Sequence, residues 1–126
     1  MGIHQEVRIK VGPEKIYVVL TSGKEFSQVT GAPADLAAVE GGAFSLFGGE
    51  ITGRNIELTA NEGLVQAWRA GMWPKGVYSI VRITLEKAGD ETKVTLDQSG
   101  FPEGAAEHLE GGWHKMYWQP LKAYLE

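Results

Sequence analysis

The chain has 126 residues, no cysteine and a formal net charge of −4 at pH 7. This length predicts one domain, residues 1–126, that buries on the order of two-thirds of its unfolded surface. The lack of cysteine excludes disulfides, thiolate catalysis and cysteine-type zinc sites. Lys and Arg are dispersed, whereas phosphate binding needs them clustered. No apolar run approaches the ~20 residues that span a bilayer, and the N-terminus has no secretion signal. We therefore expect a cytoplasmic protein that binds neither nucleic acid nor membrane.

The first part of the chain predicts one strand and two short helices. Residues 3–11 alternate between apolar and polar side chains, as in a half-buried strand. The run Gly-Pro-Glu at 12–14 opens a helix, because proline is tolerated at the first helical position. Ser22 and Glu25 have the spacing of a capping box, which predicts a second helix that ends at the run Thr-Gly-Ala-Pro at 30–33.

The middle of the chain predicts an antiparallel meander. Turn residues separate runs of roughly five to ten residues, which is the length of strands. These turns contain glycine and lie at 41–42, 48–49, 61–63, 73–76 and 88–90. The clearest hairpin pairs residues 77–87 with 92–99, where apolar and polar side chains alternate on both strands.

Residues 102–126 predict one long amphipathic helix whose apolar face is mostly aromatic. At about 100° per residue, Trp118 falls at the edge of this face, and Pro120 is expected to kink the helix near its middle. The glycines at 111 and 112 reduce helix propensity. The side chains that share the apolar arc are Ala106, Leu109, Trp113, Met116, Tyr117, Pro120, Leu121 and Tyr124.

A sheet of six to seven antiparallel strands with one face covered by a single long helix is a two-layer α+β domain. The order of strand, two short helices, meander and long helix resembles the helix-grip fold of the START-like (SRPBCC, Bet v-like) superfamily. Three segments carry a more specific resemblance: GGAFSLFGGEITG at 41–53, VQAWR at 65–69 with Trp-Pro at 73–74, and GWHKMYW at 112–118. On these segments the chain resembles the AHSA-type family, homologues of the activator of the heat-shock protein ninety ATPase.

The resemblance implies two kinds of function. Members of the wider superfamily bind lipids, polyketides and other apolar molecules in a cavity between sheet and helix, and some cyclise or hydrate them. The family itself implies a link to stress response and contact with a chaperone. Eukaryotic activators pair a domain like this one with an N-terminal domain that carries much of that contact, for which 126 residues leave no room. We therefore expect equimolar addition of this chain to change the chaperone's ATPase rate by less than about twofold.

Eight aromatic side chains are the candidate site. They come from the short helices, the sheet and the long helix, which form the three walls of a helix-grip cavity, so we predict that they bind a small apolar or aromatic molecule. If the rings instead interdigitate at normal interior density, no void larger than a water remains, and the chain is an interaction module for a chaperone or a second copy of itself as a dimer. The eight residues are Phe26, Phe44, Trp68, Trp73, Tyr78, Trp113, Tyr117 and Trp118.

Patterns for catalysis and for metal binding are missing from the sequence. There is no Gly-x-Ser-x-Gly elbow and no phosphate-binding glycine loop. The two histidines of the last segment are six residues apart, on different sides of one helix. Glu50, Arg54, Arg69 and Arg82 are acid–base candidates on predicted strands, but a shift of one residue turns each to solvent. We expect no metal and no cofactor, and the sequence favours binding, with a cyclase-like or hydrolase-like enzyme as the alternative.

Overall fold

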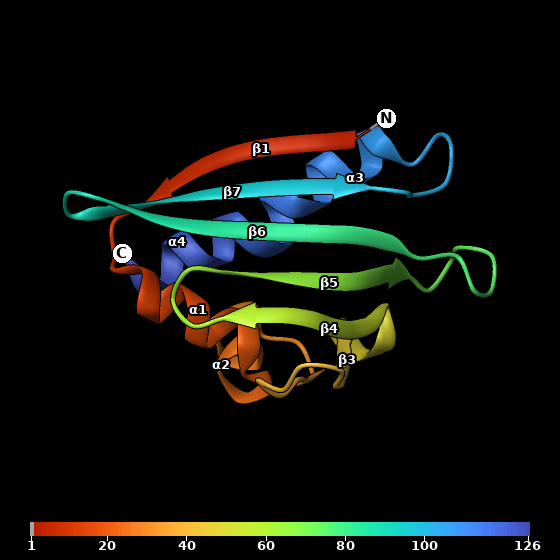
Figure 1. Ribbon diagram of the computed structural model, residues 1–126, viewed down its shortest axis with the longest axis horizontal. Coiled ribbons are helices and arrows are strands. Elements are labelled where there is room, and N and C mark those ends of the chain that lie inside the picture. The colour runs from red at the N-terminus through yellow and green to blue at the C-terminus, as the bar shows by residue number, and fades with distance from the viewer. Residues whose placement is uncertain (1) are drawn as a thin grey trace.

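A seven-stranded antiparallel sheet grips one long C-terminal helix in the computed structural model, which describes residues 2–126. The strands follow the order β1-β7-β6-β5-β4-β3-β2, and the helix crosses behind the sheet (Figure 1). Two short helices follow the first strand, and the second of them packs against the end of the C-terminal helix. The predicted α+β helix-grip fold is therefore confirmed.

The sheet is an antiparallel meander, and the first strand of the chain extends it by pairing with the last. The predicted hairpin is β6–β7, and β1 pairs with β7 from Gly2 opposite Ser99 to Ile9 opposite Thr92. β4 contains a bulge between Asn55 and Glu57, where the register with β5 shifts by one residue. The strands are β1 (Gly2–Ile9), β2 (Ala34–Asp35), β3 (Ala43–Leu46), β4 (Ile51–Thr59), β5 (Gly63–Ala70), β6 (Ser79–Ala88) and β7 (Glu91–Ser99).

Proline, a serine cap and a glycine mark the ends of the two short helices. The first, α1 (Pro13–Thr21), has proline in its first turn. The second, α2 (Gly23–Thr30), is capped by Ser22, whose hydroxyl oxygen accepts a hydrogen bond from the backbone N–H of Glu25 at 3.3 Å. Gly31 ends α2 in the left-handed conformation at φ 75°. Both predicted helices are thus confirmed.

The C-terminal helix runs from Ala106 to Leu125 as α3 (Ala106–Gly112), the π-helical η2 (Trp113–Trp118) and α4 (Gln119–Leu125). Backbone dihedrals at the two junctions are helical, so the three segments form one continuous rod. The predicted start near residue 102 is wrong, because Gly104 has φ 86° and interrupts the helical path. Within residues 2–126, no helix is long and apolar enough to cross a membrane.

The π turn changes which side chains of the helix face the sheet. The backbone N–H of Gln119 bonds to the carbonyl of His114, five residues back, and the turn ends just before Pro120. The wider turn gives room to the carbonyl that a proline ring would meet in an α-helix. Because side chains advance by less than 100° per residue here, Trp118 is 1% exposed and Met116 is 38% exposed. The sequence-based placement of Trp118 at the edge and Met116 inside the arc is therefore wrong.

Farther along the helix, Tyr124 is also exposed, which corrects its predicted place in the apolar arc. It lies in the last turn of α4, where its hydroxyl reaches Gln28 of α2 at 3.4 Å. The final turn therefore meets the short helices at the surface of the protein.

Gly53 in β4 allows the sheet to pack an aromatic ring closely. A Cβ atom at this position would lie 2.6 Å from Cζ of Phe44 and would also overlap the carbonyl oxygen of Ala67. Any side chain larger than hydrogen would push the Phe44 ring away from the strand. The glycine that ends the segment 41–53 is therefore required by packing.

We predict that Gly111→Ala and Gly112→Ala each stabilise the protein by about 0.5–1 kcal/mol. A Cβ at either position meets no atom within 4 Å, and neither residue has a positive φ, so alanine adds helix propensity without strain. Urea melts measure the change. Gly104→Ala is the matched control: its Cβ also meets open space, but its φ of 86° makes alanine destabilising. Loss of stability at 111 or 112 would contradict the prediction.

Candidate functional site: a buried aromatic cluster

The structure brings seven of the eight predicted aromatic side chains into the core. Tyr78 is the exception: it precedes β6 at the surface and is 48% exposed. The buried rings come from three walls, as predicted, and their exposed fractions lie between 1% and 8%. They are Phe26 from α2, Phe44 from β3, Trp68 from β5, Trp73 from the β5–β6 connection, and Trp113, Tyr117 and Trp118 from η2.

Trp113 is the centre of this aromatic cluster. It stacks on Trp68 with 5.5 Å between ring centroids and on Trp118 with 5.6 Å. Tyr117 lies closer still, at 4.2 Å. Phe26 meets Tyr117 edge to face at 5.5 Å. Contacts at these distances mean that the rings pack against one another, as they do in a filled interior.

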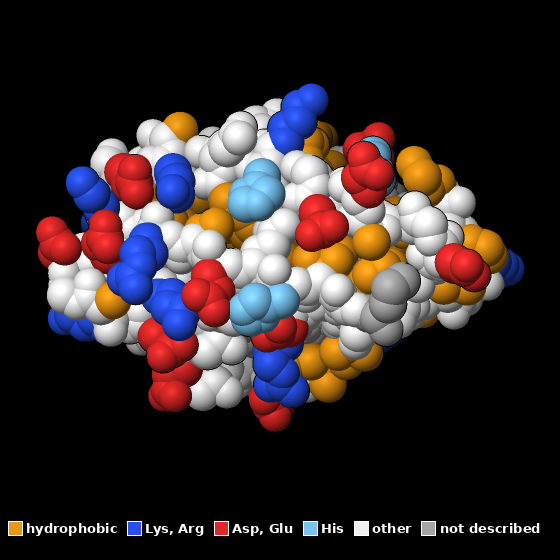
Figure 2. All heavy atoms as spheres, turned by 90° about the horizontal axis from the view of Figure 1, so that it is seen from above, with side chains coloured by type: hydrophobic (Ala, Val, Ile, Leu, Met, Phe, Trp, Pro, Cys, Tyr) orange, Lys and Arg blue, Asp and Glu red, His pale blue; other side chains and the backbone are white. Residues whose placement is uncertain are grey.

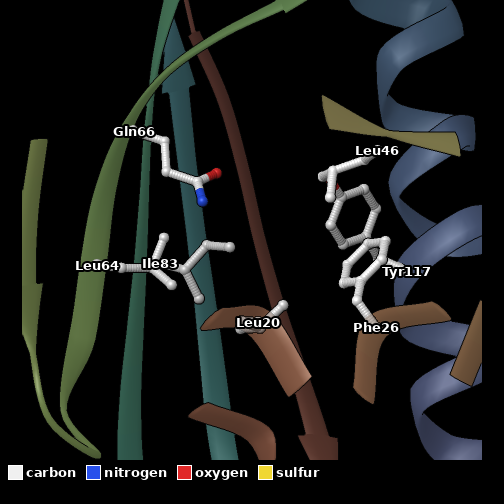
Figure 3. Close-up of a pocket in the computed structure, with 7 residues that line it drawn as sticks. All are labelled: Leu20, Phe26, Leu46, Leu64, Gln66, Ile83 and Tyr117. Carbon is white, nitrogen blue, oxygen red and sulfur yellow. The ribbon is translucent and has the colours of Figure 1, made fainter. Parts of the chain in front are cut away.

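The space left beside the rings is small. Figure 3 shows Gln66, Leu64 and Ile83 on the sheet side of this space, facing Phe26 and Tyr117. The cavity has a volume of about 10 Å³, roughly that of one water, whereas sites for small organic ligands are typically about 300 Å³ or more. Among the described residues, the space beside these rings is therefore too small for such a ligand as it stands, and ligand binding among the rings stays a prediction. The lining residues are Leu20, Phe26, Leu46, Leu64, Gln66, Ile83 and Tyr117.

Three of the four buried indoles of the cluster have a hydrogen-bond acceptor in the interior. Nε1 of Trp113 donates to Oε1 of Gln98 at 2.8 Å. Nε1 of Trp118 donates to Oε1 of Gln5, also at 2.8 Å. Nε1 of Trp68 donates to the Tyr117 hydroxyl at 3.3 Å. Burial raises the pKa of Tyr117, so this hydroxyl stays neutral.

Polar side chains on the inner face of the sheet extend this network, and the sequence-based site did not include them. Nε2 of Gln98 donates to Oγ of Ser79 at 3.0 Å, and this hydroxyl donates to the carbonyl of Trp68 at 2.8 Å. Among residues 2–126, no buried side-chain nitrogen or oxygen lacks a partner. Strand parity is the signal that could have found them, because Gln98 shares the inward side of β7 with Leu96.

The four acid–base candidates lie outside the aromatic cluster. Glu50 and Arg82 are exposed. Nη1 of Arg54 donates to the carbonyl of Gly41 at 2.8 Å, and Nη2 of Arg69 donates to the carbonyl of Trp73 at 2.8 Å. The two arginines at 54 and 69 thus bind backbone carbonyls of neighbouring loops. Within the part of the chain that the structure describes, no three His, Asp or Glu side chains come close enough to hold a metal ion.

An antiparallel sheet gripping a long C-terminal helix, with rings packed between them, defines a helix-grip domain of the START-like type. The chain belongs to the AHSA1 family: the family model described as "Activator of Hsp90 ATPase homolog 1-like protein" matches residues 10–126. This finding confirms the family resemblance noted in the sequence.

Two curated relatives show the extent of the likeness. The mouse protein "Activator of 90 kDa heat shock protein ATPase homolog 2" is 31% identical over 113 residues, which are 90% of this chain and 34% of that protein. The human homolog 1 is 30% identical over 110 residues, 87% of this chain and 32% of that protein. The chain thus spans about a third of the length of these relatives.

Solved structures agree with the fold throughout the chain. An HSP90 activator from Plasmodium falciparum superposes with a TM-score of 0.93 at 25% identity, covering 99% of this chain and 96% of that one. A protein from Colwellia psychrerythraea, described as an Aha1 dimer in solution, superposes with a TM-score of 0.85 at 23% identity, covering 100% and 96%. The second likeness shows the fold alone.

We predict that Trp113→Ala lowers the free energy of unfolding by about 3–5 kcal/mol, because a fully buried ring and its contacts are lost. Gln98→Leu keeps much of the side-chain volume but leaves the Trp113 N–H without an acceptor, for an expected loss of about 1–3 kcal/mol. Urea melts measure both.

The control for these two variants is Tyr124→Ala on the same helix. Its ring is 52% exposed, so the expected change is below about 1 kcal/mol. A loss that small for Trp113→Ala would show that the ring is not buried in solution and that the assignment of the cluster is wrong.

Proposed function

We propose that this chain is a protein-interaction module that binds a chaperone of the Hsp90 class. The family supports the proposal, since its curated relatives are named as activators of the 90 kDa heat-shock protein ATPase. The observation that carries it is the filled interior. The space beside the rings has a volume of about 10 Å³, so a partner would bind at the surface of the protein and not in its core. A stress-related role follows from such a partner.

The proposed contact surface is the end patch, which we define as Met72, Tyr78 and Ile80. These three apolar side chains lie on the β5–β6 connection and the start of β6, and they are 80%, 48% and 45% exposed. Exposed methionine and tyrosine side chains are enriched in protein interfaces, where they supply large contact area.

Contacts within the chain fix the loop that carries the end patch. The Arg69 guanidinium lies 5.8 Å from the centre of the Tyr78 ring and donates to the carbonyl of Trp73. Trp73 is buried against Trp68, with 5.8 Å between centroids, and so anchors the connection to the core. A preorganised surface loses less conformational entropy on binding, which favours affinity.

We predict saturable binding of this chain to a purified Hsp90-class chaperone, measured by isothermal titration calorimetry. Tyr78→Ala combined with Ile80→Ala should weaken binding by more than about tenfold, because both side chains lie in the proposed contact. Val39→Ala is the matched control, since Val39 is 57% exposed on the β2–β3 connection, outside the end patch. No binding by the wild-type chain would overturn the proposed function, and equal binding by all variants would overturn the end patch.

Binding of a small apolar molecule is the second candidate, and the dense aromatic cluster is the observation that favours it. A ligand would have to separate rings that now touch, and the glycines before η2 are the weakest part of the helix that covers them. The proposed ligand contacts are the buried rings of the cluster with Tyr78 at its border.

We predict that such a ligand raises the melting temperature and quenches tryptophan fluorescence. The screen uses fatty acids, flavonoids and polyketide-like rings at about 100 μM, a concentration at which micromolar binders saturate. If no compound shifts the melt, the ligand-binding proposal fails.

Self-association is the second kind of partner that we propose. A relative with this fold is described as a dimer in solution, and the sheet has a long strand at one edge.

A further inference from the structure

The outer edge of β1 is open to a partner. Among the strands of residues 2–126, β1 lies at one end of the order and pairs with β7 on one side, so its other side carries unpaired backbone groups. Figure 2 looks onto the side of the molecule on which β1 lies, where white, uncharged atoms lie between charged side chains of both signs. The strand has eight residues, whereas β2 at the opposite edge has two. β1 is therefore the edge that is long enough to accept another strand.

The side chains of β1 form an alternating row of charge. His4, Glu6 and Arg8 are exposed on the outer face of the sheet, and Val7 is half-buried on the inner face. Glu6 accepts from His4 at 3.0 Å and lies 3.7 Å from Nζ of Lys93. Nη1 of Arg8 lies 3.8 Å from Oε1 of Glu91, a long ion pair. Both Glu6 and Arg8 keep more than half of their side-chain surface exposed.

Two copies can pair such strands antiparallel about a twofold axis perpendicular to the sheet. Residues directly opposite each other then share a face, with side chains about 4.5–5.5 Å apart. A register centred on Glu6 sets Glu6 against itself and His4 against Arg8 of the second copy, which is repulsive. A register centred on Val7 sets Glu6 against Arg8 of the second copy twice, and Val7 against itself on the inner face. Charge therefore favours the register centred on Val7 over the register centred on Glu6.

We propose that two copies of this chain associate by antiparallel pairing of their β1 edges, centred on Val7. The paired sheets form one continuous sheet across the dimer, with two reciprocal ion pairs between Glu6 and Arg8 on its outer face. The inference rests on the proposed self-association and is tested apart from chaperone binding, because Glu6 and Arg8 are not residues of the end patch. Charged side chains normally block an edge strand, but here their alternation is complementary to itself in this register.

The test is sedimentation velocity of the full chain from about 10 μM to about 1 mM, the range in which weak dimers populate. Wild-type protein should dimerise with rising concentration. Glu6→Arg alone and Arg8→Glu alone should each weaken the dimer by more than about tenfold, since both ion pairs become like-charge pairs. An equimolar mixture of the two variants should dimerise again, because each position then faces its opposite charge in the other chain.

Glu86→Arg is the matched control. It makes the same charge change on an exposed residue of the interior strand β6, opposite Lys93, and should leave the dimer unchanged. Circular dichroism checks that each variant is folded. A wild-type chain that stays monomeric at about 1 mM overturns self-association itself. A dimer that survives the charge reversals overturns the β1 interface while leaving self-association intact, and a mixture that stays monomeric overturns the register centred on Val7.

Discussion

The placement of the long helix depends on two buried indole N–H groups and the glutamines that accept their hydrogen bonds. Trp113 bonds to Gln98 on β7, and Trp118 bonds to Gln5 on β1. An indole N–H buried without an acceptor costs about 1–3 kcal/mol, so sliding or rotating the helix would lose both bonds at once. The helix is thereby tied to the two neighbouring strands, and the other rings pack into the space that this position defines.

The same packing favours the surface as the place where a partner binds. The rings are in contact, no carboxylate is buried among residues 2–126, and the space beside the rings has room for about one water. The exposed side chains that could recognise a partner lie on the outside: the end patch around Tyr78 and the open edge of β1. Both proposed contacts thus use side chains and backbone outside the core.

Sequence reasoning succeeded where local chemistry decides the structure. The cap at Ser22 and the β6–β7 hairpin follow from short-range patterns, and the set of interior rings follows from apolar periodicity and from the family resemblance. It did not reveal that the rings fill their own cavity, because that depends on how the helix and sheet are placed in three dimensions. The 100° rule misplaced Trp118 and Met116, since it assumes an α-helix where the chain makes a π turn.

The π turn also bears on how the length of this helix can change. The four inward side chains of this stretch are Trp113, Tyr117, Trp118 and Leu121. Without one of the exposed residues between Trp113 and Tyr117, the same four would follow at intervals of three, one and three, which is the spacing of one face of an α-helix. The segment therefore holds one residue more than a regular helix needs, and a deletion at Lys115 would shorten the rod without turning its buried face away from the sheet.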